Sequence, residues 1–266
     1  KYIWMEKQMT KTVKLEHGHT ITFDDNKHVY IHNDEYVVGM STLLGKLASP
    51  ALEAWKVNTQ VNAIKQEMEK QGIALDTIDK IIINARANAR KANDNILSIG
   101  SIVHKLVELW LKGEKVTKPD NPVVANCFME FQKFWKKHKL KVVESEKILY
   151  SERGYCGTLD LIAKDKENNI WLIDVKTSKG LFLNMVHQLH GYKLAYEEQT
   201  GKKINKMYIV RLPKTNEPFE ARQILYKADH MKAFLGLLHC HKSELLFKEQ
   251  MRKLKSTQTK RKKNVR

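Results

Sequence analysis

The segment GTLDLIAKDKENNIWLIDVKT, residues 157–177, decides the fold of this chain. Two apolar stretches rich in Leu, Ile and Val lie on either side of a polar turn at residues 165–169. Short apolar stretches that are bounded by turn residues are typical of a β-hairpin. We therefore predict two antiparallel strands, joined by a turn that is centred on Glu167.

Two acidic side chains face each other in this hairpin. A turn that is symmetric about Glu167 pairs residues whose numbers sum to 334, so Asp160 opposes Asp174 at a Cβ separation of about 5 Å. Lys176 projects from the same face as Asp174, because side chains alternate along a strand. Adjacent carboxylates repel each other, and a hard divalent cation compensates this repulsion better than a lysine does. The triplet therefore predicts metal-assisted hydrolysis of a phosphodiester, with the lysine near the nucleophile.

Each member of the triplet also has a simpler interpretation. A single aspartate on a strand is usually exposed to solvent, and an Asp–Lys pair on a surface contributes little energy. Here Asp174 and Lys176 interrupt an otherwise apolar strand. Charges in such a strand are costly unless they are paired or used. From the residues alone, both interpretations of the triplet stay open.

The rest of the sequence predicts an α+β fold. Strands are predicted in the first forty residues and at 141–151, 206–212 and 219–226. Helices are predicted at 50–112, 122–137, 183–198 and 228–248, with breaks in the first one near Gly72 and near Ser98–Gly100. This order indicates a central mixed β-sheet flanked by helices, with N-terminal β-hairpins and a helical insertion.

Length and charge narrow the class of protein. The chain has 266 residues, 42% of them hydrophobic, which fits one large domain or two small ones. The net charge of +17 indicates an anionic partner, with nucleic acid first and a membrane surface second. No apolar run is long enough for a membrane-spanning helix, and the first residues lack the apolar core of a secretory signal. We expect a cytoplasmic protein of a bacterial or phage-infected cell that does not bind membranes, with an organelle as the alternative location.

The predicted organisation is a single domain followed by a tail. Residues 1–247 form the domain, with N-terminal strands and a helical region at 1–139 and a catalytic core at 140–247. Residues 248–266 contain nine basic residues and one acidic residue, and they lack apolar periodicity. We expect this basic tail to be disordered, either as a solvated terminus or as a segment that contacts phosphates without sequence specificity.

Four motifs follow one another along the chain: Gly100-x-x-x-His104, Gly157-Thr158-Leu159-Asp160, Asp174-Val175-Lys176-Thr177 and Gln188-x-x-x-Tyr192. In this order they resemble the RecB-like branch of the PD-(D/E)XK nuclease superfamily. That branch includes phage and mitochondrial single-strand exonucleases and the exonucleases of CRISPR adaptation. The resemblance covers about residues 38 to 212 and implies a restriction-endonuclease-like core.

The resemblance implies a metal site and a catalytic lysine. His104, Asp160 and Asp174 would bind one or two Mg²⁺ or Mn²⁺ ions through their side chains, and Val175 would bind through its backbone carbonyl. Lys176 would be the catalytic lysine. Glu146, on the preceding strand, could contact a second ion.

Other residues near these motifs would contact DNA or support the metal ligands. They are Gln188, Tyr192, Thr177, Ser178 and Glu108. Each has an alternative role: Thr177 and Ser178 could cap a strand end, Glu108 could form a helix salt bridge, and Gln188 and Tyr192 could be a buried polar pair. The neighbouring His187 and His190 are expected on the helix surface.

The resemblance implies a metal-dependent DNA exonuclease that acts on DNA ends or single strands. Its setting would be phage DNA processing, replication, recombination or repair. Cluster-bearing members of the branch use four cysteines, whereas this chain has three, so we expect no iron–sulfur cluster. Two alternatives remain open: a structure-specific or repair endonuclease with the same metal site, and a non-catalytic DNA-binding module.

Overall fold

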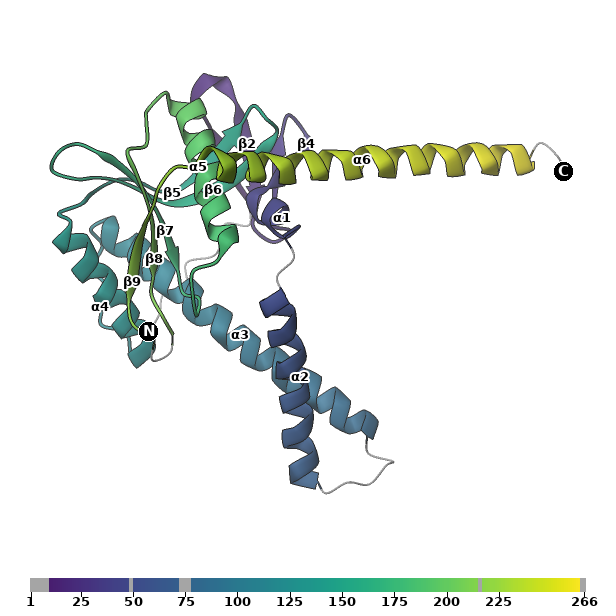
Figure 1. Cartoon of the computed structure of the whole chain (residues 1–266), viewed down its shortest axis with the longest axis horizontal. Helices are drawn as coiled ribbons and strands as arrows, with labels where there is room; N and C mark the ends of the chain where they lie inside the picture. The colour runs from purple at the N-terminus through teal and green to yellow at the C-terminus, as the bar shows by residue number, and fades with distance from the viewer. Residues whose placement is uncertain (1–9, 48–49, 72–77, 215–216, 264–266) are drawn as a thin grey trace.

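A computed structural model describes residues 10–47, 50–71, 78–214 and 217–263. Within these residues nine strands form one sheet, with helices on both of its faces (Figure 1). Two helices, α2 and α3, extend together from the body in one direction, and α6 extends from it in another. The predicted α+β class is confirmed. No helix in the described part of the chain is long and apolar enough to cross a membrane.

The sheet is mixed. Its strands are β1 (Thr10–Lys14), β2 (Thr20–Asp24), β3 (Val29–His32), β4 (Glu35–Gly39), β5 (Lys141–Ser151), β6 (Tyr155–Lys164), β7 (Ile170–Lys176), β8 (Lys206–Arg211) and β9 (Glu220–Ile224). They are arranged in the order β1-β2-β3-β4-β6-β7-β8-β9, and β5 pairs with β6. The β4–β6 and β7–β8 pairs are parallel, while the others are antiparallel.

The predicted register of the β6–β7 hairpin is confirmed. Leu161 pairs with Ile173, and Lys164 pairs with Ile170. In both pairs the residue numbers sum to 334, as expected for strands joined by a turn that is centred on Glu167. One step beyond the last regular pair, the backbone N–H of Val175 donates a 2.7 Å hydrogen bond to Oδ2 of Asp160. A side chain therefore continues the connection between the two strands where the backbone ladder ends.

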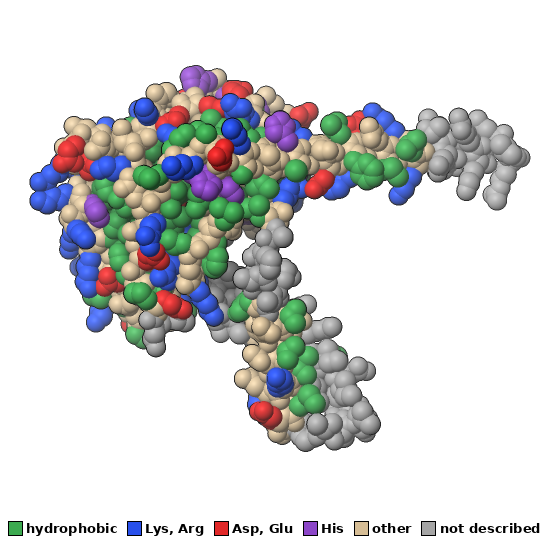
Figure 2. Space-filling view, viewed as in Figure 1, with side chains coloured by type: hydrophobic (Ala, Val, Ile, Leu, Met, Phe, Trp, Pro, Cys, Tyr) green, Lys and Arg blue, Asp and Glu red, His purple; other side chains and the backbone are tan. Residues whose placement is uncertain are grey.

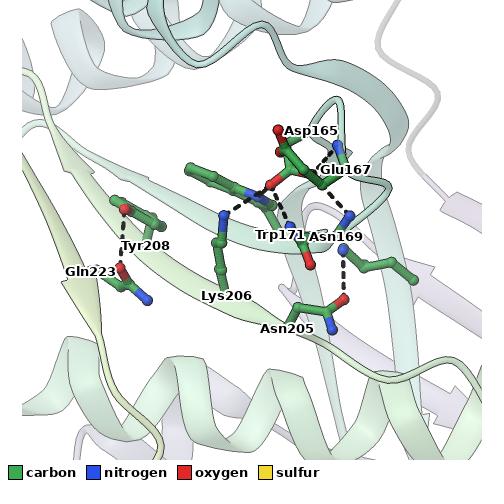
Figure 3. Close-up of polar contacts among 9 residues, drawn as sticks. Asp165, Glu167, Asn169, Trp171, Asn205, Lys206, Tyr208 and Gln223 are labelled. Atoms are coloured by element: carbon green, nitrogen blue, oxygen red, sulfur yellow. Dashed lines mark hydrogen bonds and ion pairs between the residues drawn. The ribbon is translucent and has the colours of Figure 1, made fainter.

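Asp165 organises the turn of this hairpin (Figure 3). Its carboxylate accepts hydrogen bonds from the Trp171 indole at 2.8 Å, from Lys206 at 2.9 Å and from both the backbone and the side chain of Asn169. The Trp171 ring also stacks on Tyr208, with ring centroids 4.5 Å apart. These contacts connect the turn to the neighbouring strand β8 and stabilise the register that places the acidic residues.

The predicted helices at 122–137 and 183–198 are confirmed to within two residues, and so is the predicted helix start at residue 228. The helices of the structure are η1 (Glu16–Gly18), a 3-10 helix, and the α-helices α1 (Met40–Leu44), α2 (Pro50–Gln71), α3 (Ile78–Leu111), α4 (Pro122–Lys137), α5 (Leu183–Thr200) and α6 (Ala228–Lys263). At α4 the side chain of Asn121 accepts hydrogen bonds from two backbone N–H groups, and Pro122 occupies the first turn. This cap explains why the helix begins where the sequence predicted.

The predicted break near Ser98–Gly100 is wrong, because α3 continues through it. Gly100 is buried, and the next turns place Val103 and Val107 in the core. Tertiary packing therefore outweighs the low helix propensity of glycine. The break predicted near Gly72 lies outside the described residues.

The predicted disordered tail is also wrong over its described part, because α6 continues to Lys263. The chain contains neither Gly nor Pro after Gly236, and Leu, Met, Gln, Lys and Arg all favour helix. From Lys242 to Ser256 the side chains are exposed. Figure 2 shows apolar and basic side chains side by side on this extension.

A hydrophobic core lies on each face of the sheet. One core joins α1, α5 and α6 to the sheet, through side chains such as Leu43, Leu189 and Phe234. The other joins α3 and α4 to the opposite face. Because α5 lies between the sheet and α6, His187 and His190 are buried, and the expectation that they lie on the surface is wrong.

Candidate metal centre

Three potential metal ligands meet where α3 crosses the strands β5 and β6. They are His104 on α3, Glu146 on β5 and Asp160 on β6, and their ligand atoms lie within 4.8 Å of one another. All three side chains are half-buried, and they line an open pocket of about 550 Å³. The arrangement combines one imidazole nitrogen with two carboxylates, a ligand set that divalent ions such as Mn²⁺ accept.

The backbone is irregular at this point. Glu146 has a φ of 49°, which is unusual for a residue other than glycine within a strand. The pairs on either side, Ser145 with Leu161 and Lys147 with Leu159, place Glu146 opposite Asp160. Strained residues of this kind are concentrated at functional sites. The irregularity therefore marks the pair of facing carboxylates.

Burial and neighbouring carboxylates both disfavour the ionised form of Glu146. Burial, with smaller contributions from Asp160 and Glu108, raises the pKa of Glu146 to about 8. Nδ1 of His104 lies 3.9 Å from Oδ2 of Asp160 and donates no hydrogen bond to it at that distance. A bound cation would favour the ionised form of Glu146, so the donor set of the pocket fits a divalent ion.

Asp174 is adjacent to this cluster but is paired with Lys176. The ammonium lies 2.8 Å from Oδ1, to which it donates a hydrogen bond, and 2.7 Å from Oδ2. The carboxylate is only 1% exposed, and among the described residues its Oδ2 accepts no hydrogen bond. Burial and the nearby Asp160 raise the pKa of Asp174 to about 6 despite the lysine. The predicted triplet is thus assembled, with Glu146 rather than Asp174 in the three-residue cluster.

The remaining predicted residues separate into two groups. Thr177 lines the pocket. By contrast, the Ser178 hydroxyl donates to the backbone carbonyl of Gly180, as expected for a capped strand end. Glu108 also lines the pocket, but it forms ion pairs with Lys105 and Lys112.

Gln188 and Tyr192 form a polar pair on α5. Gln188 donates to the Tyr192 hydroxyl, which donates at 2.7 Å to the carbonyl of Thr158. The Tyr192 ring packs on Gly157, where an added Cβ would lie 2.7 Å from a ring carbon. Tyr192 is only 4% exposed. The pair therefore holds the part of β6 that immediately precedes Asp160.

Sequence reasoning underestimated Glu146 and did not identify Lys214 or Ser101, which also line the pocket. A signal for Glu146 was available. The β5–β6 turn is centred near Arg153, so the symmetry argument used for the β6–β7 hairpin also places Glu146 opposite Asp160. Lys214 and Ser101 reach the pocket only through the tertiary arrangement of β8 and α3.

Comparison with known proteins identifies the class. The sequence model of the PD-(D/E)XK nuclease superfamily matches residues 77–260, and the chain belongs to this superfamily. Nucleases of this superfamily use divalent metals. None of the curated proteins matches the chain.

Among solved structures, a candidate exonuclease from Eubacterium rectale is similar at 14% identity, with a TM-score of 0.37 and coverage of 56% of this chain. A protein called SSO0001 is similar at 16% identity, with a TM-score of 0.30 and coverage of 45% of this chain. The matches span 66% and 59% of those proteins, less than two thirds of each.

Proposed function

We propose that this nuclease is a metal-dependent DNA exonuclease that acts on DNA ends or single strands. The observation that carries the proposal is the contact between the candidate metal ligands and a buried aspartate–lysine ion pair. The cluster of His104, Glu146 and Asp160 lies beside the buried Asp174–Lys176 pair, and the Asp160 carboxylate is hydrogen-bonded to the strand that bears that pair. Phage DNA processing, replication, recombination or repair in a cytoplasm is the setting we propose.

Each group has a distinct task in this proposal. His104, Glu146 and Asp160 would hold the ion, and Asp174 could add its Oδ2, while Val175 could add its carbonyl. A divalent ion at such a site lowers the pKa of a water and stabilises negative charge on a phosphoryl oxygen. The ammonium of Lys176, held by Asp174, would donate to an oxygen on which charge develops during hydrolysis.

The choice of substrate rests on charge and on the sequence motifs. The chain carries 47 Lys and Arg against 30 Asp and Glu, and such a basic protein attracts a polyanion despite its acidic pocket. The RecB-like motifs favour DNA and end-directed cleavage. Mg²⁺ and Mn²⁺ are the ions proposed, as one or two per site.

A nuclease assay on matched substrates tests the proposal. Linear single-stranded DNA and covalently closed circles would be incubated with Mn²⁺ or with EDTA. We expect degradation of the linear substrate only, no activity in EDTA and none with Asp160→Asn. The control Asp229→Asn removes a carboxylate from α6 that is 94% exposed, and it should retain activity. Cleavage of closed circles would establish the endonuclease alternative, and Mn²⁺-independent residual activity shared by wild type and Asp160→Asn would exclude the catalytic assignment.

A further inference from the structure

The pocket also has lining residues that are chemically unlike the metal cluster. Lys214, which follows β8, and Thr177, which follows β7, line it together with Ser101 on α3. These side chains provide an ammonium and two hydroxyls. The carboxylates Glu146 and Asp160 line the same pocket, so one cavity contains both an acidic group and a set of anion-binding donors.

Gly100 allows these donors to converge. A Cβ added to Gly100 would lie 2.9 Å from Oγ1 of Thr177 and 3.2 Å from Nζ of Lys214. Both polar atoms therefore border the same small volume beside α3. Any larger residue at position 100 would displace one of them, which gives the glycine of the Gly100-x-x-x-His104 motif a physical role in shaping the pocket.

We propose that Lys214, together with Thr177 and Ser101, binds a phosphate of the nucleic acid strand next to the phosphate that is hydrolysed. The inference rests on the proposed function, because it assumes that the scissile phosphate lies at the metal cluster. Ammonium and hydroxyl donors are the groups that commonly contact phosphate oxygens in nucleic acid complexes. Such a contact would fix the strand relative to the ion and to Lys176.

The electrostatics of Lys214 support this assignment. Burial lowers the pKa of the Lys214 ammonium, and the side chain is half-buried. A phosphate would stabilise the charged form. Lys105, a second lysine in the pocket, has a side chain that is 60% exposed, whereas Lys214 is half-buried and borders the volume next to Gly100. Lys214 is therefore the more enclosed of these two pocket lysines.

The test measures binding separately from hydrolysis. A fluorescein-labelled single-stranded oligonucleotide would be titrated with wild type, Lys214→Gln and Lys214→Arg in EDTA, at several salt concentrations. Loss of one charged hydrogen bond should raise the Kd about tenfold or more. Removal of one phosphate contact should also reduce the slope of log K against log salt by about 0.7. Lys214→Arg keeps the charge and should restore most of the affinity and the slope.

Lys133→Gln is the matched control, because it removes the same charge from an exposed lysine on α4 that pairs with Glu130. Its Kd and slope should equal those of wild type. If Lys214→Gln behaves like Lys133→Gln, the phosphate subsite is excluded. Thr177→Val removes a second proposed donor and should weaken binding by itself. If Lys214→Gln loses affinity only because it unfolds, its melting temperature will fall and Thr177→Val will bind like wild type. That combination would also overturn the subsite.

The subsite and the proposed function can fail separately. If wild type binds the oligonucleotide through Lys214 but hydrolyses nothing in Mn²⁺, the proposed function is wrong and the phosphate contact stands. If wild type hydrolyses DNA and Lys214→Gln leaves KM and Kd unchanged, only the subsite is wrong. If both the subsite and the proposed function are right, Lys214→Gln should raise KM and should change kcat much less.

Discussion

The ammonium of Lys176 lies 2.7 Å from Oδ2 of Asp174, in an ion pair that is buried on the aspartate side and partly open on the lysine side. The exposed fractions of the two side chains are 1% and 22%. The lysine therefore has one side held in the protein and one side accessible from solvent. This is the arrangement expected of a positively charged group that is held in place before the substrate arrives.

Replacing Lys176 should affect the chemical step more than substrate binding. For Lys176→Gln we expect kcat to fall by about 100-fold or more, because a donor to the developing charge is lost. The affinity for Mn²⁺ should stay within a few-fold, because the His104, Glu146 and Asp160 cluster is intact. Steady-state kinetics and Mn²⁺ titration check both expectations. A variant that keeps wild-type kcat would remove Lys176 from the catalytic role.

The raised pKa of Glu146 should appear in the pH dependence of stability. Its folded pKa is about 8, whereas in an unfolded chain a glutamate titrates near about 4.3. Between these values the folded protein binds more protons, so the free energy of unfolding should fall as pH rises from about 5 to 8. Denaturant titrations of the metal-free protein measure this slope, and Glu146→Gln should reduce it.

Added Mn²⁺ should oppose the loss of unfolding free energy that we expect as pH rises from about 5 to 8. Because the ion displaces the proton of Glu146, Mn²⁺ binding should tighten as pH rises over the same window. The increase in melting temperature with Mn²⁺ should be greater at pH 8 than at pH 6 and should be small in Glu146→Gln. An equal increase in wild type and variant would place the ion away from Glu146.

The close approach of α5 to β6 makes Gly157 intolerant of a side chain. In Gly157→Ala the new Cβ would meet the Tyr192 ring at 2.7 Å and Met40 at 3.1 Å. We expect a loss of about 1–3 kcal/mol in unfolding free energy, as for other overpacked cores. Gly236→Ala on α6 is the control, because no atom lies within 4 Å of its added Cβ. It should be neutral or stabilise by up to about 1 kcal/mol, and equal losses in the two variants would contradict the packing argument.

Asp165 should contribute to stability rather than to catalysis. Although burial opposes ionisation, hydrogen bonds from Lys206, Asn169 and Trp171 hold the pKa of Asp165 well below its ordinary value. Its stabilising contribution should be fully present above pH 4 to 5 and should be lost as pH falls further. Asp165→Ala should lower the unfolding free energy by about 2 kcal/mol or more at pH 7. At a temperature where the variant is folded, its kcat should be close to that of wild type.

Much of the fold could be predicted because its signals are local. The turn centred on Glu167 defined the hairpin register, and the Asn121–Pro122 cap defined the start of α4. Predictions failed where tertiary contacts decide the outcome. Gly100 remains helical because α3 packs on the sheet, and His187 and His190 are buried because α6 covers α5.

The candidate site could be predicted only in part for the same reason. Asp160, Asp174 and Lys176 share one hairpin, so strand periodicity was enough to group them. Glu146 joins them because β5 pairs with β6 about a turn centred near Arg153. Its φ of 49° is a local irregularity that strand periodicity does not predict. Lys214 joins through the parallel pairing of β7 with β8, which places two distant segments side by side.

The most direct test of the account is a crystal structure with Mn²⁺, analysed by anomalous scattering. We predict an anomalous peak among Nδ1 of His104 and the carboxylates of Glu146 and Asp160, within contact distance of all three, and no such peak in Asp160→Asn. A peak that contacts none of these residues, or no peak at a saturating Mn²⁺ concentration, would contradict the assignment of this cluster as the metal centre.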